Sequence, residues 1–171
     1  MTAAHPLRIW KVLGALVEAD VAFLVIGGVA VAAHGFERGT KDVDIVPDPE
    51  PANVERLHRA LSQLGAESLE VGDFRPEEMP YRWSAEGLAQ GGNWALMTRY
   101  GRVDVMQYVA GILEDTDDYY ELAERALVVP TSVGRIAFVS YEDLLRMKYA
   151  AGRDQDLIDI RALREARGEL E

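Results

Sequence analysis

The sequence predicts an α/β (α+β) fold in which helices flank a mixed β-sheet and a pair of C-terminal helices follows. Three observations support this class: helical and strand-like apolar periodicities alternate along the chain, glycine and proline separate them, and two helical stretches end it. The 171 residues fit one domain. We therefore expect a single domain over residues 1–171, with a core at 6–139 and C-terminal helices at 141–167.

The first half of the chain alternates helices with strands. Gly27 and Gly28 end a β-branched apolar run and predict a tight turn after a buried strand. Pro47 closes a second, alternating strand, and Gly65 ends a clearly amphipathic helix. We expect helices at 6–19, 29–34 and 52–64, and strands at 21–26 and 42–46.

The second half opens on a weakly patterned stretch, residues 66–92, whose glycines and prolines predict loops with one short strand. Two alternating runs joined through Arg99-Tyr-Gly101 then predict a β-hairpin. A helix, a short strand and two helices broken at Gly152 follow. These elements are expected at 93–98 and 102–108 for the hairpin, then at 118–127, 136–139, 141–151 and 154–167.

The composition narrows the classes of function. The chain carries 29 acidic and 18 basic residues, a net charge of −11, which disfavours a general nucleic-acid binder but leaves room for a local basic groove. The absence of cysteine excludes disulfides and cysteine-based zinc sites. The longest apolar run, 21–33, is shorter than the roughly 20 residues of a membrane span. We expect a soluble cytoplasmic protein with no membrane partner.

An acidic pair on one predicted strand is the central observation. Residues two apart in a strand point to the same face, so Asp42 and Asp44 project together, with backbones roughly 6–7 Å apart. Val43 lies between them and points to the opposite face. Two carboxylates held side by side repel each other unless a cation lies between them. Hard oxygen ligands of this kind suit Mg²⁺, with Mn²⁺ as an alternative.

A third carboxylate, Asp104, stands between apolar residues in the predicted hairpin. If its strand lies beside the strand of Asp42 and Asp44, three carboxylates converge. Such a cluster could hold two metal ions about 3.5–4 Å apart, as in two-metal phosphoryl-transfer sites. An acid–apolar–acid strand also arises by chance, and a lone strand acid often faces water. Each observation alone is therefore weak, and the joint pattern carries the hypothesis.

Residues upstream of the acidic pair suit phosphate binding. Gly27 and Gly28 let the backbone approach a phosphate closely at the start of a helix. Between the glycines and the acids, Arg38, Thr40 and Lys41 supply cations and a hydroxyl. A glycine pair is more often a plain turn, but here it precedes two acids on a strand.

The motifs Gly27-Gly-Val-Ala-Val and His34-Gly-Phe-Glu-Arg38-Gly-Thr-Lys-Asp42-Val-Asp44-Ile resemble the signature of the DNA polymerase β-like nucleotidyltransferase superfamily. The resemblance is closest to small bacterial members such as the AbiEii-type toxins and the minimal nucleotidyltransferases. It covers residues 22–46 strongly, 102–106 less so, and reappears at 141–163. It implies a nucleotidyltransferase fold.

The resemblance also implies roles for residues. Gly27 and Gly28 would hold a nucleoside triphosphate such as ATP, and Asp42, Asp44 and Asp104 would be the catalytic ligands of two Mg²⁺ ions. Many family members have serine directly after the glycines, where its hydroxyl helps to hold a phosphate. This chain departs from that pattern, because valine follows Gly28. Its phosphate contacts must then come from backbone groups and basic side chains.

The C-terminal helices resemble the Lys…Arg-x-x-Asp-x-x-Asp ending of these small proteins. Lys148 lies on the buried stripe of its helix, so it either extends to the surface or points into a cleft. With a triphosphate site predicted nearby, we favour phosphate binding. The spacing of Arg153, Asp156 and Asp159 favours a structural ion pair or cap. His34 is expected to be packed and hydrogen-bonded.

The predicted function is transfer of a nucleoside monophosphate from a triphosphate to an acceptor hydroxyl on a small molecule, a protein or tRNA. Asp104 would orient or deprotonate the acceptor, and Arg38, Lys41 and Lys148 would offset phosphate charge. A toxin–antitoxin role, with an antitoxin or a second copy as partner, is one form of this hypothesis. The alternatives are a binding or regulatory module with weak catalysis and a phosphatase of the haloacid dehalogenase type. The latter is disfavoured because a loop, rather than a hydrophobic strand, precedes Asp42.

Overall fold

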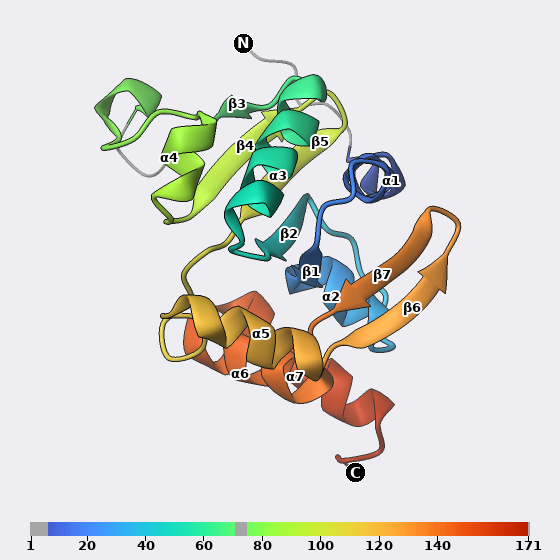
Figure 1. The fold of residues 1–171 in the computed structure, drawn as a ribbon. Helices are drawn as coiled ribbons and strands as arrows, with labels where there is room; N and C mark the ends of the chain where they lie inside the picture. The colour runs from blue at the N-terminus through green and yellow to red at the C-terminus, as the bar shows by residue number, and fades with distance from the viewer. Residues whose placement is uncertain (1–6, 71–74, 171) are drawn as a thin grey trace.

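The computed structural model describes residues 7–70 and 75–170 (Figure 1). The strands are β1 (Phe23–Ile26), β2 (Asp42–Pro47), β3 (Glu67–Ser68), β4 (Trp94–Thr98), β5 (Gly101–Val105), β6 (Leu127–Thr131) and β7 (Gly134–Phe138). The helices are α1 (Ile9–Glu18), α2 (Gly27–Ala33), α3 (Pro51–Gln63), α4 (Ala85–Ala89), α5 (Thr116–Glu124), α6 (Tyr141–Ala151) and α7 (Asp154–Ala166), with a 3-10 helix η1 at Pro76–Glu78.

The strands form one mixed sheet in the order β3-β4-β5-β2-β1-β7-β6. β2 pairs with β5 and β1 with β7 in parallel, and the other neighbours are antiparallel. In Figure 1, α3 crosses one face of the sheet over β2, β4 and β5, while α5, α6 and α7 gather at one end of the molecule. The sheet and its helices confirm the predicted fold class.

The alternation of β2 determines which of its faces is buried. Val43 and Ile45 are fully buried, as are Leu57 and Leu61 of α3, which packs against the strand. The intervening acids of β2 are only partly buried and face the other side of the sheet. The same two-residue period therefore builds the core and leaves a polar face for a site.

The sequence missed one strand of the sheet. Residues 118–127 were expected to be helical with no strand before 136, but α5 ends at Glu124 and β6 follows at Leu127–Thr131. Pro130 lowers the strand signal of this stretch. A proline is tolerated there because β6 is an edge strand that pairs only with β7.

Other boundaries also differ from the prediction. The helix expected at 29–34 begins at Gly27, so β1 runs directly into α2 with no separate turn. The stretch 66–92 contains the expected short strand, β3, but also η1 and α4, which were not predicted. Its residues 71–74, and residue 6 at the expected start of the first helix, lie outside the described residues.

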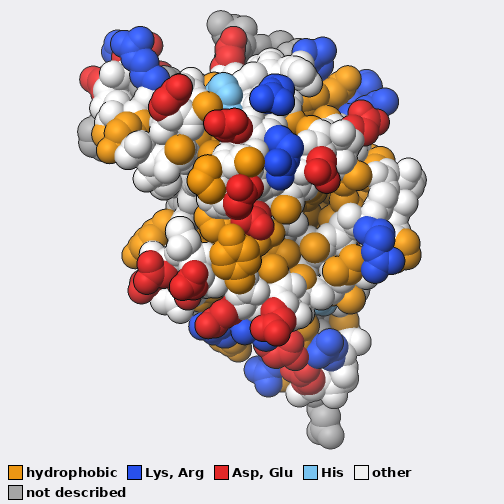
Figure 2. All heavy atoms as spheres, viewed as in Figure 1, with side chains coloured by type: hydrophobic (Ala, Val, Ile, Leu, Met, Phe, Trp, Pro, Cys, Tyr) orange, Lys and Arg blue, Asp and Glu red, His pale blue; other side chains and the backbone are white. Residues whose placement is uncertain are grey.

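The acidic run that opens α5 is exposed. Most residues between Glu114 and Glu121 face solvent, and Figure 2 shows acidic side chains gathered over this helix. The run is therefore the solvated start of a helix. Among the described residues, no helix combines the length and the apolar character needed to cross a membrane.

A buried asparagine holds α3 to the ends of both central strands. Asn53 is 1% exposed, and its Oδ1 accepts a hydrogen bond of 2.7 Å from the N–H of Ala22, just before β1. Its Nδ2 donates to the carbonyls of Ala22 and of Asp48, just after β2, each at 2.9 Å. The side chain thus satisfies three backbone groups where two strands meet a helix.

We expect Asn53→Ala to lower the free energy of unfolding by about 2–3 kcal/mol, because it removes the three hydrogen bonds that this buried side chain forms with the backbone. Urea denaturation followed by circular dichroism measures the change. Glu55→Ala, on the exposed side of the same helix, is the matched control and should change stability by less than about 0.5 kcal/mol. Equal losses in the two variants would contradict the anchoring role of Asn53.

Candidate active site

Three carboxylates meet on one face of the sheet, where β2 and β5 run in parallel. The register sets Asp44 opposite Asp104 and Asp42 opposite Arg102. One carboxylate oxygen from each of the three acids lies within 4.8 Å of the others. The sequence predicted that the three acids converge if these strands are neighbours. The strands are neighbours, and the acids converge.

The electrostatics of the cluster are those of a cation site. Burial, together with the neighbouring charges of Asp42 and Asp104, raises the pKa of Asp44 to about 7, against a smaller lowering by Lys148 and Arg102. An acid in this position resists ionisation unless a positive charge joins it. Three convergent carboxylates also form the hard oxygen donor set that Mg²⁺ and Mn²⁺ take. The residues present therefore fit a divalent metal ion.

The two glycines at the start of α2 make room for side chains of the site. Gly27 has a φ of +64°, and a β-carbon there would collide with the carboxylate of Asp44. A β-carbon at Gly28 would lie 2.8 Å from Oγ1 of Thr40. The glycines therefore allow the close approach of Asp44 and Thr40, a requirement separate from the phosphate contact predicted for them.

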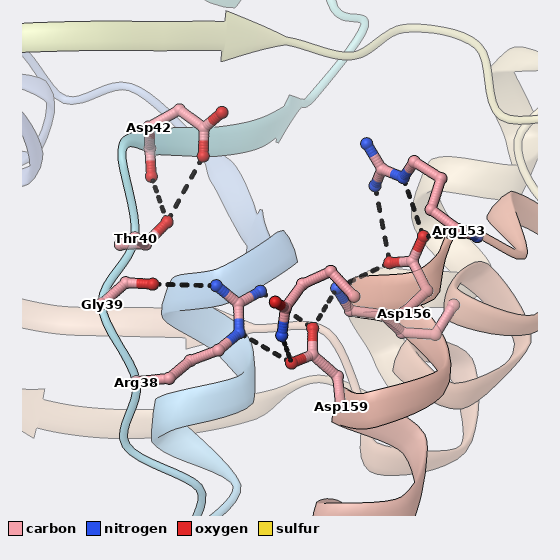
Figure 3. A network of polar contacts seen from close by, with 9 residues as sticks. Arg38, Gly39, Thr40, Asp42, Arg153, Asp156 and Asp159 are labelled. Atoms are coloured by element: carbon pink, nitrogen blue, oxygen red, sulfur yellow. Dashed lines mark hydrogen bonds and ion pairs between the residues drawn. The ribbon is translucent and has the colours of Figure 1, made fainter.

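The loop before β2 places one of its three predicted residues, Thr40, in contact with the acidic cluster. The hydroxyl of Thr40 donates to the backbone carbonyl of Asp42 at 3.1 Å and lies 3.3 Å from Oδ1 of the same residue. Arg38 points the other way and forms a two-pronged ion pair with Asp159 of α7, at 2.7 and 2.8 Å (Figure 3). Lys41 is exposed.

The C-terminal helices contribute a buried ionic network. Lys148 of α6 is 5% exposed, so it does not extend to the surface. Its Nζ lies 3.0 Å from Asp156 and 2.7 Å from Asp159, and Asp156 also pairs with Arg153 at 2.8 Å (Figure 3). The predicted ion pair of Arg153 and Asp156 is found.

The acids of this network stay ionised in the folded protein. Burial alone would raise the pKa of Asp159, but hydrogen bonds from Arg38, Lys148 and Gln155 outweigh it and hold the pKa below its ordinary value. The pKa of Asp156 is lowered in the same way, by Arg153 and Lys148. Buried carboxylates with several charge-assisted donors are rigid, so α7 is tied firmly to the loop that precedes β2.

A small cavity joins the network to the acids. It measures about 130 Å³ and is lined by Gly27 and Asp44 on the sheet side and by Lys148 and Arg153 on the helix side. Met106 adds an apolar wall. The structure thus brings Lys148 and the acidic cluster to one cavity, as expected for a lysine that points into a cleft.

One charged residue of the site was not singled out from the sequence. Arg102 stands two residues before Asp104 on β5, so the two side chains share a face. Its Nε and Nη2 donate to the two carboxylate oxygens of Asp104 at 2.7 and 2.9 Å. The pattern Arg-x-Asp within a strand was the signal available, since opposite charges two apart in a strand can pair. His34 is packed as expected, with Nε2 2.8 Å from the carbonyl oxygen of Val139.

Comparison with known protein families shows which family the chain belongs to. Residues 10–165 match the model of a family described as "Nucleotidyltransferase of unknown function" (DUF6036). The chain belongs to this nucleotidyltransferase family. No curated protein matches the sequence.

Three solved structures illustrate the similarity of the fold. The lincosamide antibiotic adenylyltransferase LnuA, solved with lincomycin, superimposes with a TM-score of 0.61 at 17% identity, over 95% of this chain and 99% of LnuA. ANT(2″)-Ia, solved with adenylyl-2″-tobramycin, gives 0.58 at 15% identity over 94% and 88%. A Thermotoga maritima protein assigned to the nucleotidyltransferases gives 0.56 at 18% identity over 97% and 98%.

At these identities the solved structures show the fold of this nucleotidyltransferase and not its substrate. The AbiEii-type subgroup and the toxin–antitoxin role stay predictions. The assignments of Asp42, Asp44 and Asp104 to metal, and of the glycines and cations to phosphate, likewise stay predictions.

We expect Asp159→Asn to lower the free energy of unfolding by about 3–5 kcal/mol, because it leaves Arg38 and Lys148 without their shared buried partner. The pKa of Asp159 is lowered in the folded state, so its stabilisation is present above the ordinary pKa of about 3.9 and is lost as the pH falls below it. The difference from wild type should therefore shrink below about pH 4.

Guanidinium denaturation at several pH values tests this expectation. Glu165→Gln is the matched control, because it removes an exposed carboxylate from the same helix, where it pairs with Arg161. It should cost no more than about 0.5 kcal/mol. A cost for Asp159→Asn as small as that of the control would refute the network as a source of stability.

We expect Asp44→Asn to stabilise the metal-free protein above pH 7. The raised pKa of Asp44, about 7 against 3.8, means that stability falls as the pH rises from about 4 to about 7, since ionisation is resisted only in the folded state. The gain is at most about 4 kcal/mol, because one pKa unit corresponds to about 1.4 kcal/mol. It should vanish near pH 4.

Thermal denaturation with and without Mg²⁺ measures both parts of this effect. Mg²⁺ should stabilise the wild type and an Asp117→Asn control, which loses an exposed acid on α5, but not Asp44→Asn. If Asp44→Asn proves less stable than wild type at pH 8 without Mg²⁺, the electrostatic description of the cluster is incorrect.

Proposed function

We propose that the protein is a metal-dependent nucleotidyltransferase that moves a nucleoside monophosphate, with ATP as the expected donor, to a hydroxyl of a small-molecule acceptor. The single observation that carries the proposal is the convergence of Asp42, Asp44 and Asp104 on one sheet face, beside a cavity that basic side chains close from the opposite side. The family membership supports the class of reaction.

The choice of a small-molecule acceptor rests on two observations. LnuA and ANT(2″)-Ia, which share the fold over nearly the whole chain, carry names or ligands that denote adenylylation of antibiotics. The net charge of −11 also disfavours tRNA as the acceptor. A protein side chain is the remaining acceptor class, and the labelling experiment below separates these outcomes.

The residues can carry out the transfer in the following way. An acceptor hydroxyl attacks the α-phosphorus in line, a new phosphorus–oxygen ester bond forms, and the bond to the bridging oxygen breaks with its electron pair leaving on pyrophosphate. Asp104 orients the hydroxyl and takes its proton. Asp42 and Asp44 are the residues that would hold Mg²⁺ together with Asp104. When bound, the metal supplies Lewis acidity at the reacting phosphate.

The basic side chains neutralise charge on the triphosphate. Lys148 and Arg153 line the same cavity as Asp44, so they lie where the phosphate chain would pass. Thr40 holds the backbone and carboxylate of Asp42 and so fixes the orientation of that acid. Lys41 is exposed beside it and adds positive charge at the rim.

Incubation with each α-³²P-labelled nucleoside triphosphate, Mg²⁺ and a panel of hydroxyl-bearing small molecules, alongside protein and RNA fractions of a cell extract, tests the proposal. We expect label on a small-molecule product, with ATP as donor. Asp42→Asn/Asp44→Asn should lose at least about a hundredfold in rate, because the metal ligands are gone. Asp117→Asn, the exposed-acid control, should label at the wild-type rate.

Label on protein or RNA would keep the reaction and change the acceptor class. Triphosphate binding that needs Mg²⁺ and the acids, without any labelled product, would replace the enzyme by a binding module. Labelling that persists in Asp42→Asn/Asp44→Asn would show that the acidic cluster is not the reaction centre.

A further inference from the structure

The acidic cluster contains its own cation. The parallel register sets Asp42 opposite Arg102 and Asp44 opposite Asp104. These four residues therefore form one patch on the sheet. The guanidinium of Arg102 engages both oxygens of Asp104, at 2.7 and 2.9 Å. The neighbouring acids, with Asp104 first, raise the pKa of Arg102 further, so it is charged at every accessible pH.

This contact competes with the metal role proposed for Asp104. A carboxylate held by a bidentate arginine has its best lone pairs directed at two N–H groups. A divalent ion that joins Asp104 must share or displace them, and it must also approach a fixed positive charge. The other two acids differ: Asp44 accepts no hydrogen bond from a described side chain, and Asp42 is bonded only to the neutral hydroxyl of Thr40.

We propose that Arg102 takes the place of a metal ion beside Asp104: it pairs with this carboxylate in the metal-free protein and releases it when a divalent ion binds. The inference rests on the proposed metal-dependent function. Arg102 is a positioning residue here, because it acts through Asp104 and not on the substrate.

The exposure of the pair makes the exchange possible. The side chain of Arg102 is 42% exposed, whereas that of Asp104 is 16% exposed. The arginine therefore has solvent beside it into which it can rotate, while the acid stays on the sheet. Breaking a partly exposed ion pair costs little, so the pair lowers metal affinity without preventing binding. A triphosphate would favour the exchange, since it brings negative charge for both the metal and the released guanidinium.

Mn²⁺ binding to the nucleotide-free protein, measured by calorimetry and by electron paramagnetic resonance of the free ion, tests the inference. We expect Arg102→Gln to bind Mn²⁺ roughly tenfold more tightly than wild type, because it keeps a polar side chain at this position but removes the competing charge. Arg102→Lys keeps the charge and should gain less than about threefold. Arg99→Gln removes an exposed arginine from the turn of the same hairpin and should leave the affinity unchanged.

The double variant Arg102→Gln/Asp104→Asn shows whether the gain passes through Asp104, in which case the tenfold increase disappears. An Arg102→Gln affinity that is unchanged or weaker, in a protein whose melting curve is intact, overturns the inference and leaves Arg102 as a structural partner of Asp104. In that outcome the proposed function stands if Asp44→Asn still abolishes Mn²⁺ binding. If the wild type binds no Mn²⁺ with or without a triphosphate, the metal-dependent function itself fails.

Discussion

The parallel register of β2 and β5 is the constraint on which the site depends. Val43 is paired with Val103 and Ile45 with Val105, and all four are fully buried. A slip of one residue between the strands would turn Asp104 into the core and a valine toward the acids. The hydrophobic core thus excludes every slip by an odd number of residues and keeps Asp104 on the face of Asp42 and Asp44. The acids need no mutual attraction to meet, and they are held together despite their repulsion.

The C-terminal helices belong to the site as much as the sheet does. Asp159 of α7 reaches across 121 residues of sequence to Arg38 and shares Lys148 with Asp156. Lys148 and Asp156 of this network line the cavity on the side opposite Asp44. Because the buried charges compensate one another, the helices carry cations close to the acidic cluster without neutralising it. The result is a cleft with acids on the sheet and paired cations on the helices.

The sequence predicted what local periodicity determines and missed what tertiary contacts determine. The strand of Asp42, the amphipathic α3 and the hairpin of Asp104 followed from apolar spacing. The adjacency of β2 and β5 is a pairing between distant segments, so it entered only as a condition. Pro130 hid the edge strand β6, and the partner of Asp159 could not be known because no local pattern connects it with Arg38. The spacing of two residues in a strand identified Asp42 and Asp44 as neighbours. The same spacing between Arg102 and Asp104 was not used, so the arginine of the site was missed.

The valine after the glycines clarifies which groups can hold a phosphate. Val29 is 8% exposed and lines a mainly apolar cavity of about 300 Å³ with Phe138, a different cavity from the one that Asp44 and Lys148 line. Arg38 is directed toward α7, where three of its five N–H groups are bonded to Asp159 and to the carbonyl of Gly39. Lys148 lines the cavity of Asp44 and suits the proposed phosphate contact, because an ammonium has three N–H donors and its two carboxylate partners use two. The carboxylates that hold this ammonium in place thus leave one donor for a phosphate oxygen beside Asp44.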